Sequence, residues 1–322
     1  MKQLIIFTYA PAGLGHIRVA DALISGMPKD MPYLEFCPAD NTTESMHRFS
    51  SLNVPARHVM EFFQRGSAEA LFTKIYTHYL KTHPDGLPEQ FVSLIRSQNY
   101  HPEKIVVVAT HFGLAYQLGA IKSRLEKELA AQISLVVQIT DDSPQIIWYV
   151  DSAELIIAPS QKTKDALLAH AARNQLKIVP IEVAPYPVDI NFACRLLPAQ
   201  INARRHQYDP DQSTPINVVI PVSGAAVGME FFLHLIARLH KLSPRFHFHI
   251  ICRKAPFTQS FLRRIGLRDY VTLYLSGQYN RVVDLYKEVY LNKVIAAEIT
   301  KPSEQAFKAL LKNDSVGGAF LL

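Results

Sequence analysis

The stretch LIIFTYAPAGLGHIRVADALISGM, residues 4–27, predicts a strand, a turn with two glycines and a helix in direct succession. Residues 4–9 form a short apolar run rich in β-branched and aromatic side chains, which is typical of a buried strand. After the turn, Ile17, Ala20 and Leu23 recur at helical spacing. Because a helix N-terminus exposes backbone N–H groups, such a turn is suited to an anion or to developing negative charge.

His16 stands at the mouth of this turn, after Gly13 and Gly15. The spacing lacks the third glycine of the dinucleotide fingerprint, and no acidic residue clearly ends a second strand, which disfavours a nicotinamide or flavin site. An imidazole can accept a proton near neutral pH. We therefore expect His16 to be a general base, with Gly13 and Gly15 as backbone donors. The alternative is a histidine in the first helical turn without a chemical role.

Composition favours a folded chain with two domains. The sequence has 322 residues, of which 48% are hydrophobic and 19% charged. It contains no apolar run long enough for a spanning helix and no signal peptide, so we expect a cytoplasmic protein. The net charge of +6 suits an anionic partner such as a nucleotide or an acidic lipid surface. Because the basic residues are dispersed, we expect no nucleic-acid partner.

The first half of the chain alternates between strand and helix patterns. After residues 4–9, the apolar strands are expected at 104–111, 133–140 and 153–160, which predicts a parallel sheet covered on both faces. Ligands of such sheets bind beyond the carboxyl ends of the strands. Four polar side chains are expected at these ends: Thr8, His111, Asp141 and Ser160.

A long insertion, residues 45–84, is rich in aromatic and basic side chains. One interpretation is a pair of packed helices. The other is a surface that binds a membrane or an acceptor, since basic and aromatic residues together fit an interfacial helix.

A second unit repeats the opening pattern. A strand at 216–222 leads into SGAAVG, residues 223–228, and then into a helix at 229–242. We predict an N-terminal Rossmann-like domain over 1–185, a crossover linker over 186–214 and a C-terminal domain over 215–322. Because the final strand pattern, 316–322, ends the sequence with no covering helix, we expect this second domain to be incomplete.

Five sequence features occur in order along the chain: Gly13-x-Gly15-His16, Thr140-Asp141 with Trp148, Pro159-Ser160, Ser223-Gly224-Ala225, and Thr300-Lys301-Pro302-Ser303-Glu304. Together they resemble the two-domain, GT-B-fold glycosyltransferases. Among these, the chain resembles the monogalactosyldiacylglycerol synthases with the processive diacylglycerol glucosyltransferases, and the peptidoglycan N-acetylglucosaminyltransferase.

The resemblance implies an α/β fold of two parallel-sheet domains facing a cleft. It implies an inverting, metal-independent glycosyltransferase without a cofactor, which moves a sugar from a nucleotide-diphosphate donor, expected to be a UDP-sugar, to a lipid or other hydroxyl acceptor. Such an enzyme would act at the inner face of a membrane as a peripheral protein. The residues expected in the site are catalytic His16 and Asp141, donor-binding Ser223, Gly224, Lys301, Ser303 and Glu304, and acceptor-side Gly13, Gly15 and His111.

Departures from the family pattern leave alternatives open. Gln145 stands where relatives usually carry a histidine, and either Glu304 or Lys308 could take the ribose-binding position. A nucleotide-sugar 2-epimerase shares the fold but needs additional acid–base carboxylates. A non-catalytic nucleotide-sugar-binding or regulatory protein is the other alternative. Individually, Asp141 could merely cap a turn and His111 could be a satisfied histidine at a strand end.

Overall fold

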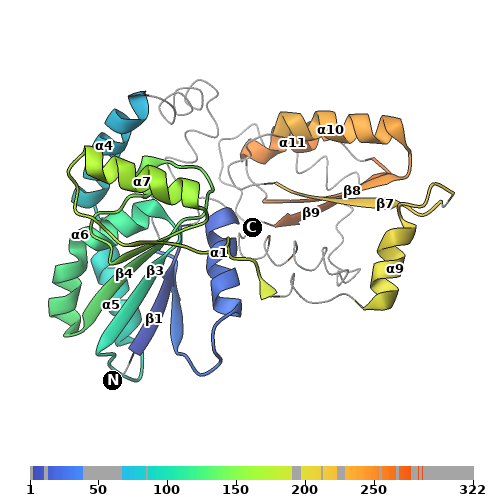
Figure 1. The fold of residues 1–322 in the computed structure, drawn as a ribbon. Coiled ribbons are helices and arrows are strands. Elements are labelled where there is room, and N and C mark those ends of the chain that lie inside the picture. Colours follow the sequence, from blue (N-terminus) through green and yellow to red (C-terminus); the bar gives the residue numbers. More distant parts are fainter. Residues whose placement is uncertain are drawn as a thin grey trace. The chain divides into compact units, whose positions relative to one another are not determined.

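The chain forms two compact units, residues 1–189 and 190–322, in a computed structural model (Figure 1). The structure describes residues 3–10, 14–38, 67–84, 86–190, 197–211, 213–222, 229–253, 256–265 and 268–276, together with Val282 and Leu285. Each unit is built around its own parallel sheet. The domain boundaries predicted from the sequence remain predictions.

The first unit contains a six-stranded parallel sheet in the order β2-β1-β3-β4-β5-β6. Its strands are β1 (Gln3–Thr8), β2 (Tyr33–Phe36), β3 (Lys104–Ala109), β4 (Gln132–Gln138), β5 (Leu155–Ala158) and β6 (Ile181–Val183). The described helices are α1 (Leu14–Ser25), α4 (Ser67–Thr82), α5 (Leu87–Arg96), α6 (Phe112–Leu129), the short 3₁₀ helix η1 (Ile146–Trp148) and α7 (Gln161–Arg173).

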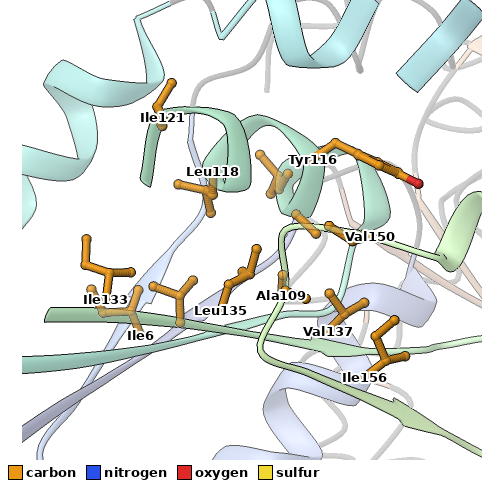
Figure 2. Packing of buried hydrophobic residues seen from close by; sticks show 14 of the residues in the cluster. Ile6, Ala109, Tyr116, Leu118, Ile121, Ile133, Leu135, Val137, Val150 and Ile156 are labelled. Carbon is orange, nitrogen blue, oxygen red and sulfur yellow. The ribbon is translucent and has the colours of Figure 1, made fainter. Parts of the chain in front are cut away.

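The core of the first unit lies between the sheet and α6. Figure 2 shows Leu118 of α6 on the side of the helix that faces Ile133 and Leu135 of β4. Helix α6 ends because Ala130 adopts the left-handed conformation, with φ 50°. The central strands place β-branched residues on both faces, as expected for a parallel sheet covered on two sides. This packing fixes the carboxyl ends of β1, β3 and β4 relative to one another.

Helix α4 packs against α6 through one side and leaves an apolar stripe on the other. Leu80 is buried, whereas Leu71 and Ile75 are 61% and 62% exposed. The interpretation of the insertion as packed helices therefore holds for α4, while residues 39–66 lie outside the described part. Every helix within the described ranges is too short or too polar to span a bilayer.

The second unit contains a three-stranded parallel sheet in the order β7-β8-β9. Its described elements are α9 (Pro198–His206), β7 (Ile216–Pro221), α10 (Met229–Leu242), β8 (Phe246–Arg253), α11 (Pro256–Ile265) and β9 (Val271–Ser276). Phe248, Ile250 and Leu273 form a separate core with Ile236 of α10 and Phe261 of α11.

The predicted fold class, α/β with two parallel sheets, is confirmed. Several elements were not predicted from the sequence, among them α5, α11, β2, β6 and α9. Strands β2 and β6 were not expected because they have only four and three residues. Helix α9 lies in the segment predicted as an irregular crossover, since its polar composition hides a helical period.

Candidate functional site

A cluster of polar and aromatic side chains lies at the carboxyl edge of the six-stranded sheet. His16 comes from the first turn of α1, which follows β1. Thr110 and His111 follow β3, and Thr140 follows β4. Since neighbouring parallel strands end at the same edge, three turns that are distant in the sequence meet here.

The ring of His16 is held through one nitrogen. Its Nδ1 lies 2.7 Å from the carbonyl oxygen of Thr110 and 3.1 Å from the hydroxyl oxygen of Thr140. Because a carbonyl oxygen can only accept, Nδ1 carries the proton and donates it. In the neutral imidazole, Nε2 then carries the lone pair. The Thr110 hydroxyl donates in turn to the carbonyl of His16 at 3.0 Å, so Thr110 fixes both the ring and its backbone.

Burial lowers the pKa of His16 below its usual value of 6.5. Two weaker influences act in the opposite direction: the hydrogen bond to the Thr110 carbonyl and the negative charge of Asp141. The imidazole is therefore neutral near pH 7. Together with the bonded Nδ1, this leaves Nε2 ready to accept a proton.

An aromatic wall surrounds His16. The rings of His16 and His111 meet edge to face, with centroids 4.8 Å apart at 86°, and His111 stacks on Phe112. Trp148 meets Phe112 edge to face at 5.5 Å and lies 6.3 Å from His16. A Cβ atom at Gly113 would lie 2.8 Å from Cε1 of His111. Glycine is thus required at this position to let the His111 ring pack.

Two buried polar atoms at this edge have no hydrogen-bond partner among the described residues: the hydroxyl oxygen of Thr8 and the indole nitrogen of Trp148. Both side chains are fully buried. Buried polar groups are ordinarily paired, and leaving one unpaired is costly. Both groups lie at the carboxyl edge of the sheet, where ligands of parallel sheets bind, so a ligand there could form hydrogen bonds with them.

Two acidic residues follow β4 and have different surroundings. Asp142 accepts hydrogen bonds from the hydroxyls of Ser160, at 2.6 Å, and Thr163, at 3.1 Å, and so supports the first turn of α7. Asp141 is exposed, and its charge acts on His16 and on the half-buried Tyr186. Burial raises the pKa of Tyr186, and the nearby charge of Arg18 opposes this rise.

The structure brings together three of the expected residues, His16, His111 and Asp141. Gly15 lies in the first turn of α1 with open space around its Cα. The other expected residues lie outside the described part of the chain: Gly13, Ser223, Gly224, Lys301, Ser303 and Glu304.

Sequence reasoning missed Thr110, Arg18 and Tyr186. Thr110 could have been found, because it sits beside His111 at a strand end. Tyr186 follows β6, whose three residues are too short to show a strand pattern. Arg18 reads as an ordinary polar position on an amphipathic helix.

Comparison with known proteins identifies no family. No family model matches the sequence, and no curated protein does. Among solved structures, MnaA from S. aureus, determined with UDP, aligns over 89% of this chain and 71% of its own, with TM-score 0.44 and 12% identity. A UDP-GlcNAc 2-epimerase from Neisseria meningitidis, bound to UDP-GlcNAc, aligns over 89% and 75%, with TM-score 0.42 and 11% identity.

These comparisons correct the leading functional expectation. The named enzyme among the neighbours is a UDP-GlcNAc 2-epimerase rather than a glycosyltransferase, so the expected inverting transfer to a lipid or other hydroxyl is wrong as the main interpretation. The neighbours agree better with the alternative, a nucleotide-sugar 2-epimerase. The resemblance to the galactolipid, glucolipid and peptidoglycan transferases has no support from sequence families. At 11–12% identity the likeness does not carry an activity to this chain.

Proposed function

We propose that the chain is a nucleotide-sugar 2-epimerase in which His16 is the base. The observation that carries the proposal is the hydrogen bond from Nδ1 of His16 to the Thr110 carbonyl, which leaves Nε2 unprotonated. Inverting a C–H centre requires that the C–H bond break on one face and that a proton return on the other. A fixed, neutral imidazole is suited to take that proton.

Asp141 is the candidate for the second acid–base group. The negative charge of Asp141 raises the pKa of His16, and Asp141 follows β4, the strand that neighbours β3. Asp142 is less suited because Ser160 and Thr163 already occupy its carboxylate. Taking a proton from one face and returning one to the other requires a second acid–base group besides the histidine, and Asp141 is our candidate for it in the first unit.

The nucleotide diphosphate is assigned in this proposal to the second unit. Strand β7 ends at Pro221 and α10 begins at Met229, so the small residues 223–228 directly precede a helix N-terminus in the sequence. Such a position favours phosphate oxygens. On the basis of the sequence, the nucleotide part of the substrate is proposed to be held by Ser223, Gly224, Lys301, Ser303 and Glu304. The proposal includes no lipid acceptor.

The test uses UDP-GlcNAc as substrate, in deuterated water and without an acceptor. An epimerase incorporates solvent deuterium at C2 and forms the epimeric sugar, both of which proton NMR detects. Replacing His16 with Gln should lower the rate about 10²–10⁴-fold, the usual contribution of a general base. His101→Gln, at an exposed position before β3, is the matched control.

Two outcomes would contradict the proposal. UDP-GlcNAc that binds but keeps its C2 proton would select the non-catalytic alternative. If His16→Gln lowers turnover by no more than about twofold, the loss is too small for a general base, and His16 would have a structural role instead.

A further inference from the structure

A cavity of about 570 Å³ opens in the second unit, at the amino edge of its sheet. Pro215, Arg245 and Tyr270 of its lining directly precede β7, β8 and β9. This is the edge opposite to the carboxyl end of β7, which leads in the sequence to the residues proposed to bind the nucleotide. The volume falls within the range of roughly 300–1,000 Å³ that small-molecule sites occupy.

One wall of the cavity is an aromatic pair. The rings of His240 and Tyr270 stack with centroids 3.6 Å apart and planes at 17°. Arg268 reinforces this wall: its Nη1 donates to the Tyr270 hydroxyl at 2.8 Å and its Nε to the carbonyl of Ile265 at 2.8 Å. The stack is therefore held in place before any ligand arrives.

Arg245 provides a fixed positive charge in the lining. Its Nε donates to the carbonyl of Thr214 at 3.1 Å, its Nη1 to that of Asp209 at 2.9 Å and its Nη2 to that of Gln207 at 2.7 Å. A guanidinium has five N–H groups, so two remain unused. None of the described carboxylates forms an ion pair with it, and its charge stays available.

His240 contributes a second unused polar atom. Its Nδ1 is buried and has no hydrogen-bond partner. Because His240 lines the cavity, a bound oxyanion would supply the missing partner if Nδ1 carries the proton of the ring. The one acidic side chain of the lining is the exposed Asp269.

The C-terminus of α10 also points toward this edge, and its carbonyls carry about −0.5 elementary charge in total. The full positive charge of Arg245 outweighs that partial charge, and Arg268 adds another behind the aromatic wall. The local balance favours a negatively charged guest.

We infer that this cavity binds the oxyanion of a small organic molecule, a phosphate ester or a carboxylate, at a site separate from the proposed epimerase site. Arg245 and His240 would hold the oxyanion, and the apolar part of the guest would rest against Phe246 and Pro215.

Calorimetric titration of the full chain with AMP, benzoate and adenosine tests the inference. AMP binding identifies a phosphate ester as the guest class and benzoate binding a carboxylate; adenosine, which has no oxyanion, should bind at least about tenfold more weakly than AMP. His240→Phe keeps the ring stack but removes Nδ1, so the affinity for the bound anion should fall about tenfold. His234→Phe, the same change at an exposed position on α10, is the control and should leave the affinity unchanged.

Asp269→Asn provides a change of opposite sign, because it removes the negative charge from the lining. We expect the anion to bind roughly twofold to fivefold more tightly, as for one exposed charge pair. Binding of neither anion at millimolar concentration would overturn the inference. Anion binding that responds equally to His240→Phe and His234→Phe would place the guest elsewhere, such as at the proposed nucleotide site, and would overturn the inference.

Discussion

A single hydrogen bond decides what His16 can do. Were Nε2 bonded to the Thr110 carbonyl instead, Nδ1 would carry the lone pair. With Nδ1 as the bonded atom, at 2.7 Å, the lone pair belongs to the opposite nitrogen. The two threonines at strand ends thus act as positioning residues, one through its backbone and one through its hydroxyl.

The pKa of the single residue His16 can be tested directly. Burial lowers it, and the Asp141 charge partly opposes that effect. Asp141→Asn removes the opposing charge, so the pKa should fall further. Titration of the His16 ring signals by NMR should show a midpoint below 6.5 in the parent and a lower one in the variant. Asp30→Asn, exposed and located before β2, should leave the midpoint unchanged. A higher midpoint in Asp141→Asn would show that Asp141 does not face His16.

The sequence predicted His16, His111 and Asp141 because each follows an apolar strand, and strand ends of a parallel sheet converge. It could not predict which nitrogen of His16 is bonded, since that depends on a carbonyl about a hundred residues away in the chain. Nor could it predict that Gly113 makes room for the His111 ring, because this contact depends on the direction of two side chains.

At the scale of elements, the sheet of the second unit carries a polar network across its three strands. Nε2 of His249 lies 2.9 Å from the amide oxygen of Asn217 and therefore donates to it. Nδ1 then accepts from the hydroxyl of Tyr274, also at 2.9 Å. Neutral His249 thus links β7, β8 and β9. Burial lowers its pKa to about 4, and the neighbouring His247 contributes to this.

The network predicts acid sensitivity of the second unit. Between about pH 6.5 and pH 4, the unfolded chain binds a proton at His249 that the folded chain does not. Stability is therefore present above pH 6.5 and is lost as the pH falls toward 4. One such group contributes at most about 1.4 kcal/mol per pH unit, and we expect less because His249 is only half-buried.

His249→Phe should flatten this dependence in urea unfolding followed by circular dichroism, while losing about 1–3 kcal/mol at pH 7 through the two broken hydrogen bonds. His234→Phe should retain the parent slope. An unchanged slope in His249→Phe would assign the acid sensitivity to other groups.

Long periodic elements were the most predictable. The helix at 229–242 was predicted residue for residue. The apolar positions of such elements face a core, so apolar residues recur in the sequence with the period of the helix or strand. Strands β2 and β6 are too short to show any period, and their place in the sheet depends on pairing with β1 and β5.

At the scale of the whole molecule, the two units have separate hydrophobic cores. Leu135 lies in the first and Ile250 in the second, and both side chains are almost completely buried. The single tryptophan, Trp148, belongs to the first core and so reports on that unit alone.

Two matched variants test whether the cores unfold independently. Leu135→Ala should lower the free energy of unfolding seen by Trp148 fluorescence by about 2–5 kcal/mol, as usual for a buried large-to-small change. Ile250→Ala should cost the second unit a similar amount, seen by circular dichroism, and leave the fluorescence midpoint in place. Equal shifts of both signals in both variants would mean that the chain unfolds as one cooperative unit.

The strand order also has a kinetic consequence. Strand β1 lies between β2 and β3, and Gln3 is paired with Lys104, about a hundred residues further along the chain. During synthesis β1 emerges first but gains its second neighbour only after β3 has left the ribosome. Closing so long a loop is entropically costly before the contacts form, which slows folding. An apolar strand with one open edge is exposed throughout this interval, so this nascent chain is a natural client for chaperones that bind extended hydrophobic segments.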